Sequence, residues 1–245
     1  MKFMIRIFIW GCALFSSVLW AQQASSTTDV IDRARATRGS EKALDAVVTL
    51  EMVCSLEPAN PKVPAATVLI IARKPNSQRL EIRDDDIVET TILNGRKACI
   101  IRSNLNQEAS RMRALTDPER KRVNYSTRQL FNFYRPDFKN GEKVEYQGIQ
   151  THRDKRAHKI SYKYPDSVHT VRYFSVEDDT LVATVSDDGV ESVNRGAQVV
   201  KGIKFPESID YYEKGRKLHS IRLNKVSVNE PLAAGIFQVP TAPEK

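Results

Sequence analysis

Much of the chain alternates apolar and polar residues with a period of two, which is typical of half-buried β-strands. In residues 49–56, every second side chain is apolar and falls on one face. Residues 67–72 are apolar on both faces, which indicates a more deeply buried strand. Asn94-Gly95 is a typical two-residue hairpin turn. Further strands are predicted at residues 79–83, 91–93, 97–102, 143–148, 157–164, 168–176, 181–186, 201–205, 208–213 and 218–228.

Only two regions have helical spacing of their apolar residues. Residues 28–48 form one region in two pieces, separated at Gly39, with Ser40 placed to cap the second piece. A second helix is predicted to start at Asp117, as N-cap, with Pro118 as its first helical residue, and to end near Pro136. Both helices are amphipathic, and two are too few to form a layer of their own.

The order of these elements predicts an α+β fold. About ten or eleven strands joined by hairpins make an antiparallel meander, and a large meander curls. We expect a strongly curved sheet, a half-open barrel, with the helices across or inside its concave face. The sequence shows no repeat and no linker, so residues 22–245 are predicted to form a single domain.

Residues 1–21 have the order of a secretory signal peptide. Lys2 and Arg6 precede an apolar stretch of about 14 residues, too short for a transmembrane helix of roughly 20, and Ala21 offers a cleavage site. We therefore expect a periplasmic protein that starts close to Gln22. Cys12 lies inside the apolar stretch after the bulky Trp10, so we expect no lipid anchor there.

The mature chain is basic. Its formal net charge falls from +8 to +6 when Lys2 and Arg6 are removed. Export argues against a nucleic-acid partner, and anionic lipid headgroups, an acidic protein or plain solubility remain as explanations. Basic groups that could form a rim for anionic lipid, or could be ordinary solvated faces, are Arg111 with Arg113, Arg120-Lys121-Arg122, and Arg153 with Lys155-Arg156.

Residues that could perform chemistry are scattered. The four histidines do not have metal-site spacing, no serine or cysteine lies in a nucleophile-elbow pattern, and the glycines form no phosphate loop. The acidic runs at residues 84–86, 177–179 and 187–188 lack the spacing of a calcium loop and suit solvated turns. We expect no enzyme, cofactor or metal. Cys54 and Cys99 fall on separated strands, so no disulfide between them is expected.

Several short patterns resemble the outer-membrane lipoprotein carrier (LolA-like) superfamily, which includes lipoprotein-sorting proteins. They occur in the family's order over most of the mature chain: Arg38-Gly39-Ser40-Glu41-Lys42-Ala43-Leu44, Arg73-Lys74-Pro75-Asn76, Asn94-Gly95-Arg96-Lys97, residues 141–160, and residues 228–240 with Phe237 and Pro240. The carriers themselves place arginine directly before the hairpin proline, where this chain has Lys74, and often tryptophan where it has Cys99. The resemblance is therefore to the superfamily more than to its dedicated lipoprotein shuttles.

The resemblance implies a cavity for lipid or lipoprotein acyl chains, closed by a helical lid. The function expected is a monomeric carrier that binds and releases such chains, with envelope membrane proteins as candidate further partners. The alternative is a lipid-sensing or partner-binding regulatory or scaffold module of the cell envelope. Ordinary core packing is the alternative role for each candidate residue. The candidate ligand-binding residues are Leu50, Met52, Leu69, Ile71, Ile82, Ile100, Leu130, Phe131, Tyr162 and Phe174, and the candidate lid contacts are Arg73 and Lys74.

Overall fold

A computed structural model describes residues 26–107, 109–165 and 168–240. The expected signal peptide at residues 1–21, its cleavage site and Cys12 lie outside these residues. Within them, no helix has the length and hydropathy needed to cross a membrane.

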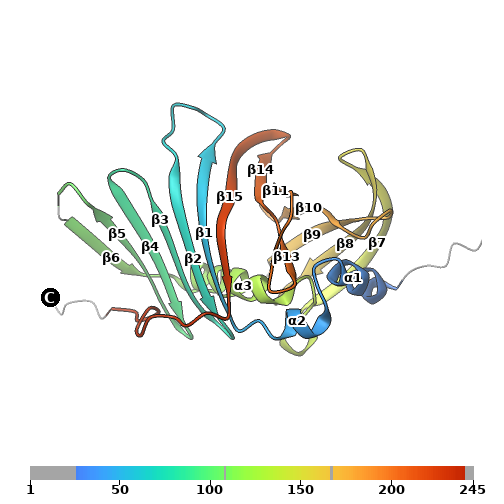
Figure 1. Ribbon diagram of the computed structural model, residues 1–245, viewed down its shortest axis with the longest axis horizontal. Helices are drawn as coiled ribbons and strands as arrows, with labels where there is room; N and C mark the ends of the chain where they lie inside the picture. Colours follow the sequence, from blue (N-terminus) through green and yellow to red (C-terminus); the bar gives the residue numbers. More distant parts are fainter. Residues whose placement is uncertain (1–25, 108, 166–167, 241–245) are drawn as a thin grey trace, which may run out of the picture.

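The described chain is dominated by one antiparallel sheet of 13 strands (Figure 1). Its strands are β1 (Thr49–Pro58), β2 (Ala66–Arg73), β3 (Ser77–Arg83), β4 (Ile87–Asn94), β5 (Lys97–Asn104), β6 (Ala109–Ala114), β7 (Lys143–His152), β8 (Lys155–Lys163), β9 (His169–Ser175), β10 (Leu181–Ser186), β11 (Val190–Arg195), β14 (Ser208–Glu213) and β15 (Arg216–Val228). A short hairpin of β12 (Gln198–Val200) and β13 (Ile203–Phe205) forms a separate two-stranded sheet.

The strand order confirms an unclosed, curved meander. From one edge to the other it runs β6-β5-β4-β3-β2-β1-β15-β14-β11-β10-β9-β8-β7. The first six strands form one half of the sheet and the later strands form the other. The two halves meet where β1 pairs with β15, at Leu50↔Val228 and Met52↔Val226.

The count of ten or eleven strands was too low. Strands β6, β11 and β12 carry few apolar residues in alternation, and Met112 is the only large one in β6. Residues 201–205, expected as one strand, contain the Lys201-Gly202 turn of the β12–β13 hairpin.

The helices start at capping residues and lie on the concave side (Figure 1). Helix α1 (Thr27–Ala36) begins after Ser26, whose side chain accepts from the Asp29 amide, and α2 (Glu41–Asp45) begins after Ser40 as predicted. Helix α3 (Asp117–Asn132) starts one residue earlier than expected, because Thr116 is the N-cap and forms a capping box with Glu119. A 3-10 turn (Phe138–Asn140) follows it.

Two apolar clusters fill the concave side. Leu44 and Val47, around α2, pack with β1, β2, β15, the β12–β13 hairpin and the end of α3. Val30, Ile31 and Ala34 of α1 pack on β8 and β9 in the other half of the sheet. The helices therefore act as a covering layer, and the space that they leave unfilled is the candidate site.

Candidate functional site

A cavity of about 280 Å³ lies between α3 and the concave face of the sheet. Its wall crosses the join between the two halves of the sheet, from β2 and β1 through β15 and β14 to β9. Its apolar lining is Leu50, Met52, Cys54, Ile70, Leu130, Phe133, Leu181, Phe205, Pro206, Ile209, Ile221 and Leu223, and its polar lining is Arg38, Gln129, Tyr134, Arg172, Thr184, Asn194 and Tyr211.

Strand register brings the apolar wall together. Residues directly paired across an antiparallel ladder point to the same face. Met52 pairs with Ile70 on one side and with Val226 on the other, and Cys54 pairs with Val68 and Leu223. The alternation seen in residues 49–56 is therefore continued by its neighbours as one apolar surface.

Helix α3 forms the cover of the cavity. Gln129 and Leu130, in its last turn, line the space, together with Phe133 and Tyr134 just after it. Phe133 and Tyr134 have φ of 45° and 76°, so two successive residues without glycine are held in the left-handed region. This reversal brings both rings back under the helix.

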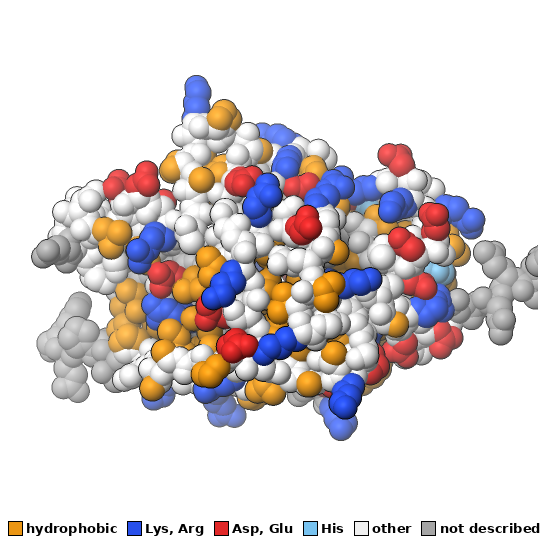
Figure 2. Space-filling view, viewed as in Figure 1, with side chains coloured by type: hydrophobic (Ala, Val, Ile, Leu, Met, Phe, Trp, Pro, Cys, Tyr) orange, Lys and Arg blue, Asp and Glu red, His pale blue; other side chains and the backbone are white. Residues whose placement is uncertain are grey.

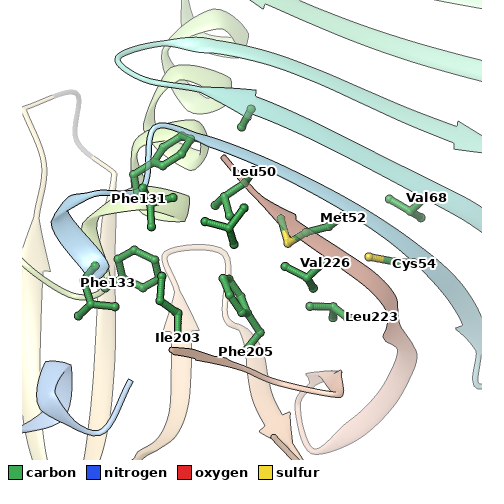
Figure 3. Packing of buried hydrophobic residues seen from close by; sticks show 14 residues of the cluster. Leu50, Met52, Cys54, Val68, Phe131, Phe133, Ile203, Phe205, Leu223 and Val226 are labelled. Atoms are coloured by element: carbon green, nitrogen blue, oxygen red, sulfur yellow. The ribbon is translucent and has the colours of Figure 1, made fainter. Parts of the chain in front are cut away.

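Phe131 and Phe133 connect the cover to the core. Figure 3 shows Phe133 beside Ile203 and Phe205 of the β12–β13 hairpin, and Phe131 above them, on the side of Leu50. The rings of Phe133 and Phe205 meet edge to face at 6.5 Å between centroids. The end of α3 is therefore packed into the core, whereas Leu130 packs at the edge of this cluster and is partly exposed to the cavity.

A buried arginine anchors the C-terminal end of α3. Arg35 of α1 is 1% exposed and donates to the carbonyl oxygens of Asn132 and Phe133, the second at 3.0 Å. It also makes two 2.9 Å bonds to the carboxylate of Glu41 in α2. The hydrogen bond from Arg35 lowers the pKa of Glu41, so the pair is ionised at neutral pH. Arg35 thus joins all three helices.

The predicted ligand-binding residues divide into four groups. Leu50, Met52 and Leu130 line the cavity, and Phe131 lies in the adjoining core. Ile82 and Ile100 belong to the same concave face, further toward β6. Ile82 pairs directly with Val68, and Ile100 is reached from Ile70 by successive pairing through Leu80 and Thr91. The other members fall elsewhere.

Leu69 and Ile71 point to the convex face. Leu69 pairs with Val53, and Ile71 pairs with Glu51, whereas the cavity wall uses Met52 and Ile70. Both faces of β2 are apolar, so its sequence does not reveal which set is inside.

Tyr162 and Phe174 lie on the concave face of the other half, under α1. Both are almost fully buried in the cluster around Val30 and Ile31. They form the packed floor next to the cavity instead of its lining. Phe174 also meets the Tyr134 ring at 5.3 Å.

The two predicted lid contacts, Arg73 and Lys74, lie on opposite faces of the sheet, and only Lys74 contacts the helices. The Lys74 ammonium lies 5.7 Å from the centre of the Phe131 ring and donates to the carbonyl oxygen of Asp45 at 3.3 Å, so it touches both α3 and α2. Arg73 faces the convex side, where its guanidinium lies 5.0 Å from the Phe237 ring.

The sequence did not indicate the arginines of the cavity. Arg172 of β9 is 7% exposed and lies with its guanidinium 4.2 Å from the centre of the Tyr162 ring. It donates to the Gln129 side chain on α3. Its position between Thr170 and Phe174, on the apolar side of the strand pattern, was the signal that could have identified it.

The thiol of Cys54 is part of the cavity wall. Burial raises its pKa to about 11, so the thiol is neutral at pH 7. Cys99 is also free and buried, but its ladder runs through Ile92 and Arg79 to Ile71 on the convex face. Within the described ranges, no group of histidine, cysteine or carboxylate side chains could hold a metal ion.

Comparison with solved structures shows which proteins share this architecture. A DUF1329 family protein from Desulfovibrio piger matches with a TM-score of 0.58 at 8% identity, over 86% of this chain and 96% of that one. An outer membrane lipoprotein-sorting protein domain from Vibrio parahaemolyticus matches with a TM-score of 0.56 at 7% identity, over 85% and 94%. A LolA superfamily protein from Nitrosomonas europaea matches with a TM-score of 0.55 at 11% identity, over 86% and 97%.

Comparison of the sequence alone finds no relative. No protein-family model matches the chain, and no curated protein matches its sequence. At these identities the structural likeness concerns the fold, and it extends over most of the chain. The half-open barrel with helices across its concave face is the fold of these solved structures, one of which is a LolA superfamily protein.

Proposed function

We propose that this protein is a periplasmic carrier that holds an acyl chain in the cavity beneath α3. The observation that carries the proposal is the apolar wall between α3 and strands β1, β2, β14 and β15. The expected signal peptide at residues 1–21 and the fold shared with a lipoprotein-sorting domain support an envelope role.

Binding and release would need no covalent chemistry. Each methylene group moved from water into an apolar site contributes roughly 0.8 kcal/mol. A cavity of about 280 Å³ lies just below the usual volume of ligand sites, which is roughly 300–1,000 Å³. It suits a single acyl chain, whose binding energy still permits exchange with a membrane or an acceptor.

Native mass spectrometry of the protein purified from the cell envelope tests this function. The expected result is a set of adducts with the masses of acyl lipids, which are lost after extraction with an organic solvent. Leu130→Trp tests whether the cavity is the binding site. The larger side chain should fill the cavity and reduce the amount of these adducts.

Two outcomes would count against the carrier. One is a stoichiometric protein partner without lipid, which would favour the regulatory module. The other is equal lipid binding by Leu130→Trp and wild type, which would remove the cavity from the function.

A further inference from the structure

A second cavity, basic in character, adjoins the apolar one. It has a volume of about 360 Å³ and shares with the first cavity Arg38, Tyr134, Leu181, Asn194, Phe205 and Pro206. These shared residues form the boundary between the two spaces. One molecule could therefore occupy both.

The second cavity contains five basic residues and no acidic residue in its lining. Arg153 is paired with Glu191, and Arg195 is paired with Asp210. Across residues 26–240, apart from the three undescribed positions, Arg38, Lys155 and Lys204 have no carboxylate at ion-pair distance. The charge of Lys155 also acts on the nearby Asp178 carboxylate, but none of the three side chains is held in a direct ion pair with a described residue, so each can turn to a ligand. A cleft lined by one sign of charge concentrates the opposite ion.

Arg38 is held at the boundary by its backbone. Its carbonyl oxygen accepts from the Lys204 amide at 2.7 Å, which fixes the α1–α2 connection against the β12–β13 hairpin. At the next residue, Gly39, a Cβ would lie only 2.8 Å from the Gly202 carbonyl oxygen, so the close approach requires glycine. The Arg38 side chain donates to the Tyr134 hydroxyl at 3.1 Å.

Arg172 adds a buried cation on the other side of Tyr134. The Tyr134 ring centre lies 5.8 Å from the Arg38 guanidinium carbon and 5.4 Å from that of Arg172. Among the described residues Arg172 has no carboxylate at ion-pair distance; it donates to the Gln129 side chain and lies against aromatic faces, while the buried Glu142 carboxylate interacts with its charge from further away. Burying a charge without a counter-ion in direct contact is costly, and an anion at this boundary would lower that cost.

Figure 2 shows hydrophobic side chains gathered across the middle of the visible face, with Lys and Arg side chains around them.

We propose that the two cavities together bind a single-chain lipid with an anionic head group, a carboxylate or a phosphate. The head lies in the basic cavity beside Arg38, Lys155 and Lys204, and the chain passes Tyr134 into the apolar cavity. Guanidinium and ammonium groups form strong charge-assisted hydrogen bonds to both kinds of head. This inference rests on the proposed function and adds the class of ligand.

Titration calorimetry on the mature chain tests the head-group preference. The probes are decanoate, decyl phosphate and decanol, each below its micelle concentration, and inorganic phosphate alone. We expect both anionic amphiphiles to bind at least tenfold more tightly than decanol, and inorganic phosphate to bind far more weakly than decyl phosphate.

Surface variants separate the head from the chain. Lys155→Gln with Lys204→Gln changes two exposed side chains and should weaken decyl phosphate binding at least fivefold while leaving decanol unchanged. Arg38→Gln should weaken decyl phosphate binding more than decanol binding, and some loss of decanol binding is expected because Arg38 also lines the apolar cavity. Lys97→Gln with Lys225→Gln removes the same amount of charge from exposed positions on β5 and β15 and should change neither ligand.

The outcomes distinguish the inference from the function that it extends. Equal binding of decanol and decanoate would overturn the anionic head while leaving the carrier intact. Inorganic phosphate bound as tightly as decyl phosphate would show an anion site without a lipid. Failure of all three amphiphiles to bind would reject both the inference and the carrier.

Discussion

At the scale of single residues, Cys54 reports on the cavity from inside its wall. With a pKa of about 11, only about one thousandth of this thiol is ionised at pH 8, and the thiolate is the form that reacts. Cys99 offers an internal comparison because it lies on the opposite face of the sheet.

Alkylation by a small neutral reagent should therefore be slow at Cys54 and should accelerate about tenfold for each pH unit up to pH 10. Decanoate should slow the reaction of Cys54 further, because an acyl chain would cover the thiol, and should leave Cys99 unaffected. Mass spectrometry of the two cysteine peptides measures both rates. Equal protection of both cysteines would point to a general change in stability instead.

Arg35 is the residue on which the helical cover depends. Arg35→Met keeps the unbranched apolar part of the side chain but removes the guanidinium, which leaves two helix-end carbonyl groups without this donor. The carboxylates of Glu41 and Asp45 are about half exposed, which reduces the effect of losing their partner. We expect the free energy of unfolding to fall by about 2–3 kcal/mol.

The matched control is Arg33→Met on the same helix. Among the described residues Arg33 makes a single ion pair, with Asp179, and its side chain is 43% exposed, so its removal should cost less than about 1 kcal/mol. Urea denaturation of the two variants compares them. Similar losses at both positions would show that Arg35 has no special role.

At the scale of elements, α3 combines two functions in adjacent residues. Phe131 is buried in the core, whereas Leu130 is partly exposed to the cavity. The two side chains point to different surroundings although they are consecutive in the helix.

Phe131→Ala should lower the free energy of unfolding by about 3–5 kcal/mol, because it removes a ring from a packed cluster. Leu130→Ala should cost markedly less stability and should weaken binding of a fluorescent fatty acid, because it removes one wall of the cavity. Thermal unfolding beside a displacement assay separates the two effects. If Leu130→Ala leaves the binding unchanged in a folded protein, α3 does not contact the ligand.

Period-two alternation predicted most strands, and Ser40 and the Asp117-Pro118 pair located the starts of two helices to within a residue. The alternation also placed Leu50 and Met52 on one face. It could not place Leu69 and Ile71, because the choice between the two apolar faces of β2 depends on its register with β1. Arg35 and Arg38 were missed because their roles come from contacts with residues more than 90 positions away.

At the scale of the whole molecule, the strand order requires a long connection. Strands β6 and β7 follow each other in sequence but occupy opposite edges of the sheet. The chain between them must cross the open side, and α3 is that crossing (Figure 1). It bonds to both halves: the Thr127 hydroxyl contacts the Gln78 side chain on β3, and Gln129 accepts from Arg172 on β9.

Thr127→Val should weaken the attachment of α3 to β3, because valine has the shape of threonine but lacks the hydroxyl that bonds to Gln78. It leaves the buried Gln78 oxygen without a donor, so we expect a loss of about 1–3 kcal/mol and faster release of a bound fatty acid. Ser126→Ala is the control, because the exposed Ser126 hydroxyl bonds only within the helix, to the Val123 carbonyl oxygen. Stopped-flow displacement measures the release rate. Equal rates in the two variants would argue against α3 as the gate.

The unpaired edges give the cup a freedom that a closed barrel lacks. Because β6 and β7 do not pair with each other, no ladder of backbone hydrogen bonds sets the width of the opening. That width is set by side-chain contacts of the helical cover, in which α3 reaches β3 and β9 and Arg35 joins α3 to the other two helices. A small bend about the β1–β15 join would therefore change the space inside while every strand kept its neighbours, and chains of different length would be accommodated without any unfolding.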